Sequence, residues 1–322
     1  MQNELTTEQK QVLDTCHKVI REIKKVIIGK DDIIIKVLLS ILAGGHVLIE
    51  DIPGVGKTTL AIALSKALSL DYKRVQFTPD VLPTDITGFM TLNRETNKFE
   101  YKKGAAMTNL FLADEINRTS SKTQSALLEV MEEGRVTVDG VTYDLPDPYI
   151  VIATQNPIGS IGTQMLPESQ MDRFIVRLTM GYPSLQNEIE MLKSKQRQVS
   201  TDAVNPVASA SALSRAVSVT DDIYISDPVF EYIAMLSAAT RKHPFVKLGL
   251  SPRGTIALLK MTKATALLNG RDFALPDDTL YAFKEVCGHR IILNSKAKLS
   301  GADVNYVLGE VINSVPVPKV RA

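Results

Sequence analysis

Lys57 and Thr58 follow a short glycine-rich turn, and these residue types together can bind the phosphates of a nucleotide. The turn contains Gly54 and Gly56 and comes directly after the apolar run Val47–Ile49, which we expect to form a buried strand. Glycine permits positive φ, so backbone N–H groups can point together at one anion. In such a turn the lysine reaches the β- and γ-phosphates and the hydroxyl ligates Mg²⁺. The segment therefore predicts a phosphate-binding loop.

A helix predicted over Thr59–Leu70 would present its positive N-terminus to the same anion. The loop departs once from the usual pattern G-x-x-x-x-G-K-[ST], because Asp51 stands at the first glycine position. For this segment alone, the alternative is a chance glycine-rich turn between a strand and a helix. The residues of the loop that we expect to contact the nucleotide are Pro53, Gly54, Val55, Gly56, Lys57, Thr58 and Thr59.

Two acidic residues end the next candidate buried strand. Asp114 and Glu115 directly follow Leu110–Ala113. A carboxylate at a strand end beside a phosphate loop can hold Mg²⁺ through its water shell, and Asp114 fits this role. Glu115 is then placed to polarise a water molecule for attack on the γ-phosphate, which is the work of a general base. An isolated Asp-Glu pair is also what a strand running into solvent would end in; its order after the phosphate loop favours the catalytic interpretation.

A third apolar run, Tyr149–Ala153, ends in the polar residues Thr154, Gln155 and Asn156. Open α/β sheets bind their ligands at the carboxyl edge of the strands. An amide there can bind the γ-phosphate or the attacking water, and Asn156 is our candidate. Thr154 and Gln155 are neighbours with supporting roles.

Two arginines further along the chain, Arg173 and Arg253, follow residues that typically form turns or mark the ends of helices, and both could reach a triphosphate. Guanidinium suits that task because its charge is permanent and its donors are forked. Taken alone, each is more often a surface or ion-paired arginine.

These residues can act together only if the strands that they follow end at the same edge of one sheet. As far as Pro183, apolar strands alternate with helices, which indicates a parallel sheet flanked by helices. Two hairpins interrupt this pattern, at Phe89–Tyr101 and at Arg135–Tyr143, the second around the tight-turn pair Asp139-Gly140. The helices predicted in this part are Thr7–Val26, Asp32–Ala43, Thr59–Ser69 and Ser121–Glu133, and the remaining strands are Lys73–Thr78 and Phe174–Leu178.

Beyond Pro183 the pattern is helical, with a connector over Val199–Val207. We therefore expect an α/β nucleotide-binding domain over residues 1–198 and a small all-α domain over residues 199–322. The predicted helices are Ser184–Gln196, Val207–Val217, Asp227–Arg241, Pro252–Asn269, Pro276–Cys287 and Gly301–Ile312.

Composition and charge narrow the function classes. The 322 residues carry 37 basic and 36 acidic side chains, and the resulting net charge of +1 weighs against a dedicated nucleic-acid binder. The two cysteines, Cys16 and Cys287, lack the spacing of a zinc site and fit a reducing cytosol. The beginning of the chain has no apolar core like that of a signal peptide, and the longest apolar stretch, Val37–Ile49, is too short to span a bilayer. We expect a cytoplasmic protein without a membrane span.

The order of the motifs resembles that of an AAA+ ATPase, with the phosphate loop as Walker A, Asp114-Glu115 as Walker B, Asn156 as sensor 1, Arg173 as arginine finger and Arg253 as sensor 2. Within AAA+ proteins the chain resembles the MoxR family over roughly residues 10–300. The segments that carry the resemblance are Gly45–Thr58, Leu112–Arg118, Ala153–Pro157, Leu166–Phe174 and Ser251–Arg253.

The resemblance implies an AAA+ P-loop NTPase core with β-hairpin inserts, followed by a helical lid. ATP and Mg²⁺ would sit between core and lid, with Ile28 and Gly29 near the adenine. Arg253 would sense the γ-phosphate in cis, whereas Arg173 would act on the ATP of the neighbouring subunit in a homo-oligomeric ring, by resemblance a hexamer. The hairpins would act on a client protein, in this family often one with a von Willebrand factor A domain or a bound metal. The output would be chaperone-like remodelling or activation, with metal or cofactor insertion as one form.

Other functions fit parts of the pattern. A magnesium-chelatase-like motor subunit shares the insert architecture, and a nucleotide-gated scaffold would bind ATP with little turnover. A DNA or RNA motor is disfavoured by the near-neutral charge. An ABC-type ATPase would need a Leu-Ser-Gly-Gly-Gln-like signature, which this sequence lacks. A small-molecule kinase would not require Arg173, Arg253 and a helical lid in this order.

Overall fold

Five parallel strands form the central sheet of the computed structural model, which describes residues 5–52, 54–156, 165–197 and 200–319. Their order across the sheet is β2-β5-β8-β1-β9, and every neighbouring pair is parallel. The predicted α/β class is therefore confirmed. The strands are β1 (Val47–Glu50), β2 (Tyr72–Gln76), β5 (Leu110–Asp114), β8 (Ile150–Gln155) and β9 (Val176–Leu178).

The three central strands are apolar up to their polar carboxyl ends, because both faces of the sheet are covered. On β5, Leu110 and Leu112 pack into one hydrophobic cluster, whereas Phe111 and Ala113 pack into the other. The first cluster lies with helices α1 (Thr7–Lys24), α2 (Asp31–Leu42) and α3 (Lys57–Ala67); the second lies with α5 (Ser121–Glu133). The two buried layers fix where the strands end.

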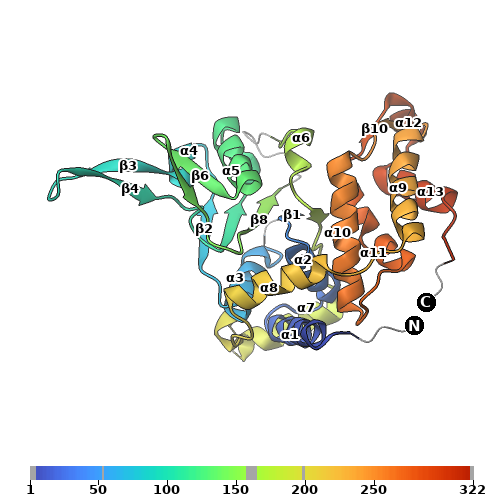
Figure 1. Cartoon of the computed structure of the whole chain (residues 1–322), viewed down its shortest axis with the longest axis horizontal. Helices are drawn as coiled ribbons and strands as arrows, with labels where there is room; N and C mark the ends of the chain where they lie inside the picture. The colour runs from blue at the N-terminus through green and yellow to red at the C-terminus, as the bar shows by residue number, and fades with distance from the viewer. Residues whose placement is uncertain (1–4, 53, 157–164, 198–199, 320–322) are drawn as a thin grey trace.

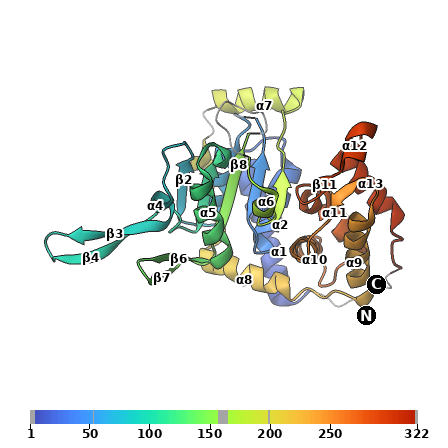
Figure 2. The ribbon, with the colours of Figure 1, turned by 90° about the horizontal axis from the view of Figure 1, so that it is seen from above.

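Two antiparallel hairpins extend from one side of the sheet (Figures 1 and 2). The longer pairs β3 (Gly88–Asn93) with β4 (Lys98–Lys103), and the shorter pairs β6 (Arg135–Val138) with β7 (Val141–Asp144). Both were predicted at these places. The longer hairpin exposes apolar side chains, including Phe99 at 70%.

Most of the helical region, from Asp227 onward, lies on the side of the sheet opposite the hairpins in Figure 1. Its main helices match the predicted ones to within a few residues at each end. The helices after β9 are α7 (Leu185–Gln196), α8 (Ala210–Asp221), α9 (Asp227–Lys242), α10 (Pro252–Leu268), α11 (Pro276–Cys287), α12 (Ser295–Ser300) and α13 (Val304–Ser314).

The structure differs from the sequence-based expectation in several short elements. The helical region holds an antiparallel pair, β10 (Val246–Leu248) with β11 (Ile292–Leu293), which is too short to show a period in the sequence. Helix α12 was missed for the same reason, as were the single turns α4 (Pro83–Thr87) and α6 (Glu168–Met171) and the 3₁₀ turns η1 (Ile116–Arg118) and η2 (Thr201–Ala203). The predicted domain division falls on residues 198 and 199, outside the described ranges, and stays a prediction.

Caps explain the two differences at helix starts in the helical region. The helix predicted from Val207 begins at Ala210, because the Ser209 side chain accepts the amide hydrogen bond of Ala212. The helix predicted from Gly301 begins at Val304, with Asp303 as its cap. Within the part of the chain that the structure describes, no helix is long and apolar enough to cross a membrane.

Candidate functional site

The polar ends of three adjacent strands meet at one edge of the sheet. Strand β8 lies between β5 and β1, so Asn156, which follows β8, comes between the phosphate loop after β1 and the Asp114-Glu115 pair of β5. The register pairs Leu48 with Ala153 and Ala153 with Ala113. The strand order thus brings the predicted motifs to the same edge.

The phosphate loop has positive φ angles at both of its glycines. Gly54 and Gly56 have φ of 87° and 96°, a region that side chains with a Cβ rarely adopt. Helix α3 begins at Lys57, two residues before the predicted start, so Thr58 and Thr59 lie in its first turn. The expected contact residue Pro53 lies outside the described residues.

Asp51, which replaces the first glycine of the usual pattern, has a structural role. Its side chain is buried, and the carboxylate accepts hydrogen bonds from the amide of Ile52 at 2.7 Å and from the amide of Gly181 at 2.6 Å. A carboxylate bound by backbone N–H groups stabilises such a turn strongly. The departure from the pattern is therefore compensated by bonds that glycine could not make.

Lys57 is held within the loop. Its ammonium donates to the carbonyl oxygen of Asp51 at 2.8 Å. Burial lowers the pKa of Lys57, while the charges of Asp51, Asp114 and Glu115 oppose this effect. The lysine is a buried cation next to acidic groups, which is the setting for a phosphate-binding charge.

Thr154 joins the two acidic residues. Its hydroxyl donates to the Asp114 carboxylate at 2.6 Å and accepts from the amide of Glu115 at 2.8 Å. Glu115 has φ of 56° and ψ of 49°, a left-handed conformation that is uncommon outside glycine. Its carboxylate pairs with Arg118 at 2.8 Å. The supporting role expected for Thr154 thus has a definite geometry.

Arg74 on the edge strand β2 was missed by sequence reasoning. Its Nη2 and Nε donate to the second oxygen of Asp114 at 2.7 and 3.1 Å. The pairing of Gln76 with Asp114 in the sheet register explains this contact, since it places β2 side chains beside the end of β5. No motif in the sequence indicates it; the only signal is a charged residue near the end of a strand.

These groups surround a cavity of about 350 Å³, which is lined by Gly54, Gly56, Lys57, Thr58, Thr59, Arg74, Gln76, Asp114 and Glu115. Two cations, two carboxylates and two hydroxyls in one cavity fit a phosphate chain with a hydrated divalent ion. A second cavity of about 360 Å³ lies between α5 and the β6–β7 hairpin and contains none of the predicted site residues.

The segment expected near the adenine lies beside the start of α7. Gly29 has φ of 70°, and a Cβ added to it would lie 2.0 Å from the Asn187 side chain. Lys30 donates to the carbonyl groups of Gly181 and Tyr182 at 2.9 and 3.0 Å. Ile28 is half-buried next to these residues. Asn187 was not predicted, because its position depends on packing between segments far apart in sequence.

Three of the predicted catalytic residues, Asn156, Arg173 and Arg253, are not among the residues that line the cavity. The main-chain oxygen of Asn156 accepts from the Asn117 side chain at 3.1 Å. Arg173 pairs with Glu132 at 3.0 Å, and Arg253 also pairs with Glu132. The two arginines therefore lie together at the end of α5. The sequence suggested a cis role for Arg253 and a trans role for Arg173, and did not predict that the two would be neighbours.

Comparison with known families agrees with this geometry. Residues 46–176 match the ATPase family associated with various cellular activities (AAA), and residues 238–309 match the AAA lid domain. The chain is 34% identical to Chaperone MoxR1 of Mycobacterium tuberculosis, over 96% of this chain and 84% of that protein. The chain belongs to the MoxR family of AAA+ ATPases.

Other relatives are similar over nearly their whole length. The uncharacterised protein YeaC of Bacillus subtilis is 47% identical, over 95% of each chain, and Protein MoxR of Methylorubrum extorquens is 29% identical, over 92% of this chain and 94% of that one. A crystal structure of a candidate ATPase from Cytophaga hutchinsonii superposes with a TM-score of 0.90 at 35% identity, covering 97% of each chain. The fold expected for this family is thereby confirmed, and membership of an ATPase family supports ATPase activity in general terms.

Proposed function

We propose that this MoxR-family protein binds and hydrolyses ATP and uses the cycle to remodel a partner protein. The observation that carries the proposal is the single cavity that brings Lys57, Asp114 and Glu115 together beside the glycine-rich loop. Family membership alone supports nucleotide binding, whereas this set of groups supports hydrolysis.

In the proposed complex, the loop residues Gly54 to Thr59 bind the phosphates. Backbone N–H groups of the loop and the N-terminus of α3 face the cavity that would hold the anion. Lys57 would leave the carbonyl oxygen of Asp51 and bind the β- and γ-phosphates. Pro53, Val55, Ile28 and Gly29 complete the proposed contacts, the last two next to the adenine.

Thr58 and Asp114 are the residues that would hold Mg²⁺, an ion that neutralises charge on the phosphates when it is bound. Both residues line the cavity. Magnesium commonly uses one or two protein oxygens and keeps several waters, so this small donor set fits it. Because Arg74 already binds one oxygen of Asp114, its guanidinium would lie beside the metal ion and the phosphates.

Glu115 is the proposed general base. Glu115 lines the cavity, its backbone is left-handed, and its carboxylate pairs with Arg118. It would accept a proton from the water that attacks the γ-phosphate. Asn156, at the end of the neighbouring strand, would orient that water or the γ-phosphate.

Arg173 is proposed to act on the ATP of a neighbouring subunit, in a closed head-to-tail ring of six. An arginine supplied in trans neutralises charge in the transition state. The shared contact with Glu132 favours Arg253 acting beside Arg173 on the same nucleotide. The cis role that the sequence suggested for Arg253 would require its side chain to leave this pair.

The hairpins are proposed to act on the client. They extend from the core and expose Phe89, Leu92 and Phe99. Exposed apolar side chains on a projecting element suit transient protein contact. A client with a von Willebrand factor A domain, and metal or cofactor insertion as the outcome, are suggested by the family resemblance, and one relative is named a chaperone.

The Glu115→Gln variant tests hydrolysis directly. The variant keeps the shape of the side chain but cannot accept the proton, so we expect ATP binding to persist and turnover to fall by about 10²–10⁴-fold. Glu310→Gln, an exposed change in the helical region, is the matched control and should leave both unchanged. Unchanged turnover in Glu115→Gln would show that the base is assigned wrongly, and absent turnover in the wild-type protein would favour the nucleotide-gated scaffold.

A further inference from the structure

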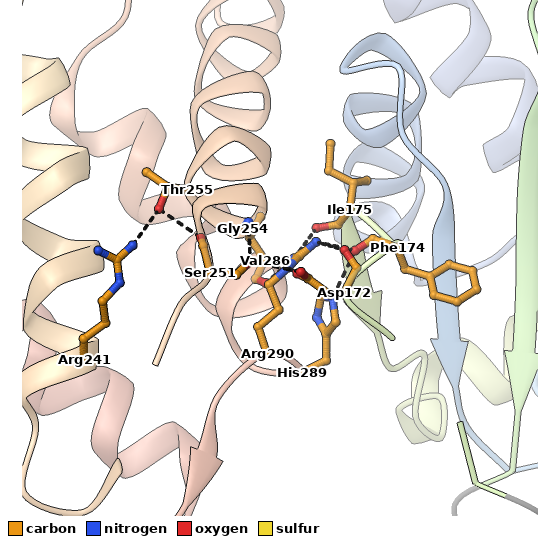
Figure 3. A network of polar contacts seen from close by, with 10 residues as sticks. All are labelled: Asp172, Phe174, Ile175, Arg241, Ser251, Gly254, Thr255, Val286, His289 and Arg290. Carbon is orange, nitrogen blue, oxygen red and sulfur yellow. Dashed lines mark hydrogen bonds and ion pairs between the residues drawn. The ribbon is translucent and has the colours of Figure 1, made fainter. Parts of the chain in front are cut away.

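Arg290 lies at the junction between the helical region and the segment that carries Arg173 (Figure 3). Its side chain is 2% exposed. Nε donates to the carboxylate of Asp172 at 2.6 Å. The terminal nitrogens donate to the main-chain oxygens of Asp172 at 3.0 Å, Phe174 at 2.6 Å and Ile175 at 3.0 Å. One guanidinium thus binds the main chain on both sides of Arg173.

Asp172 extends this contact to the helix that carries Arg253. The second oxygen of its carboxylate accepts a hydrogen bond from the hydroxyl of Ser251 at 2.9 Å. Ser251 is the N-cap of α10, and its hydroxyl also accepts from the amide of Gly254 at 3.0 Å. Arg253 is the second residue of α10, so the partly buried carboxylate of Asp172 links the backbone segments that carry Arg173 and Arg253.

Gly254 provides the space for this arrangement. A Cβ at this position would lie 2.8 Å from Cδ of Arg290 and 2.5 Å from the side chain of Leu250. The stem of Arg290 therefore packs directly against the first turn of α10. His289 adds a further contact across the same junction, because its Nε2 lies 3.1 Å from the main-chain oxygen of Phe174.

We propose that Arg290 is a positioning residue that holds Arg173 and Arg253 in one fixed arrangement at the junction of core and lid. This inference rests on the proposed function, because a fixed arrangement affects turnover only if these arginines act on ATP. The helical region and the Arg173 segment then move together, and movement of the lid moves both arginines relative to the phosphates. Arg290 itself is not among the residues that line the proposed nucleotide cavity.

Arg290→Lys is the smallest change that removes the hydrogen bonds of the Arg290 guanidinium to the segment around Arg173. It keeps the positive charge but replaces a planar fork with a compact ammonium, which cannot reach the same set of acceptors. We expect turnover to fall by roughly 10- to 100-fold, because small displacements of catalytic groups have effects of this size. The dissociation constant for ATP should change by less than about twofold, since the phosphate loop is untouched.

Arg271→Lys is the matched control. Arg271 is also a partly buried lid arginine with a forked contact, to Asp278 at 2.6 and 2.7 Å, but this contact lies within the helical region. It should lower thermal stability without changing turnover. Asp172→Asn is a second test variant if Arg290→Lys does not fold.

Mixing subunits separates positioning from a general structural effect. Glu115→Gln subunits offer intact arginines but cannot hydrolyse ATP. If Arg290→Lys damages only the arginines that a subunit donates, then adding Glu115→Gln subunits should restore hydrolysis at Arg290→Lys sites, as it should for Arg173→Ala. Restoration for Arg173→Ala but not for Arg290→Lys would overturn the positioning role, as would unaltered turnover in Arg290→Lys alone. Restoration for neither would show that no arginine acts in trans, so the proposed function would fail in that respect and the positioning role with it.

Discussion

Arg173 and Arg253 bind the same carboxylate, that of Glu132, although they lie 80 positions apart in sequence. Two like charges share this position because the acidic group lies between them. Their adjacency supports the proposal that both arginines act on one nucleotide.

A subunit-mixing experiment tests whether Arg253 acts in trans. Arg253→Ala subunits alone should have reduced turnover, and adding Glu115→Gln subunits should restore part of it, because the latter donate an intact Arg253 to the neighbouring site. The measurement is ATP turnover against the mixing ratio. If turnover only declines as Glu115→Gln is added, Arg253 acts in cis, as the sequence resemblance suggested.

Thr154 is expected to control the orientation of Asp114. Thr154→Val keeps the shape of this buried side chain but removes the hydroxyl that binds Asp114 and the amide of Glu115. Loss of a partner that orients a metal ligand typically lowers metal affinity or activity by about 10–100-fold. We expect a higher Mg²⁺ concentration for half-maximal turnover, with Thr154→Ser close to wild type. A Thr154→Val protein with wild-type Mg²⁺ dependence would contradict this role.

Asp51→Gly restores the usual glycine pattern, yet we expect it to weaken the protein. The variant removes the acceptors for the amides of Ile52 and Gly181 in a buried site, and leaving such donors unpaired costs about 1–3 kcal/mol each. Urea unfolding and titration with a fluorescent ATP analogue should show lower stability and weaker binding than Asp51→Asn. Tighter ATP binding by Asp51→Gly would mean that the pattern matters more than these bonds.

His289 should make stability depend on pH. Burial lowers the pKa of His289 well below its usual value, and the charges of Arg290 and Arg177 act in the same direction. The unfolded chain takes up this proton near about pH 6.5 and the folded protein does not, so the free energy of unfolding falls as the pH drops below that value. The slope from this group is at most about 1.4 kcal/mol per pH unit.

His289→Gln provides the comparison for that pH effect. Glutamine can still donate to Phe174 and does not titrate, while Nδ1 of His289 has no hydrogen-bond partner to lose. Urea unfolding at about pH 7 and about pH 5.5 should show a smaller loss for the variant. Equal losses in both proteins would assign the acid sensitivity to other groups.

Site residues that belong to short contiguous motifs could be predicted from the sequence. The glycine turn with Lys57 and Thr58, and the carboxylates that end β5, lie in short segments whose chemistry requires neighbouring residues in a fixed order. The parallel sheet followed from apolar runs that alternate with helices. The predicted strands and main helices are therefore confirmed to within a few residues.

Residues that act through packing could not be predicted in this way. Arg74 reaches Asp114 across 40 positions of sequence, and Arg290 reaches Asp172 across 118. The hydrogen bond from the amide of Gly181 to the Asp51 carboxylate is equally long-range. Such contacts depend on which strands become neighbours and on how the helical region docks, so no spacing rule reveals them.

The most direct test of the account is the steady-state ATP turnover per subunit as a function of protein concentration, for wild type and Arg173→Ala. A trans-acting arginine requires a neighbouring subunit, so we predict that the wild-type rate per subunit rises with concentration and that the variant remains slow throughout. A rate that is independent of concentration and of Arg173 would contradict a ring in which neighbouring subunits complete each site.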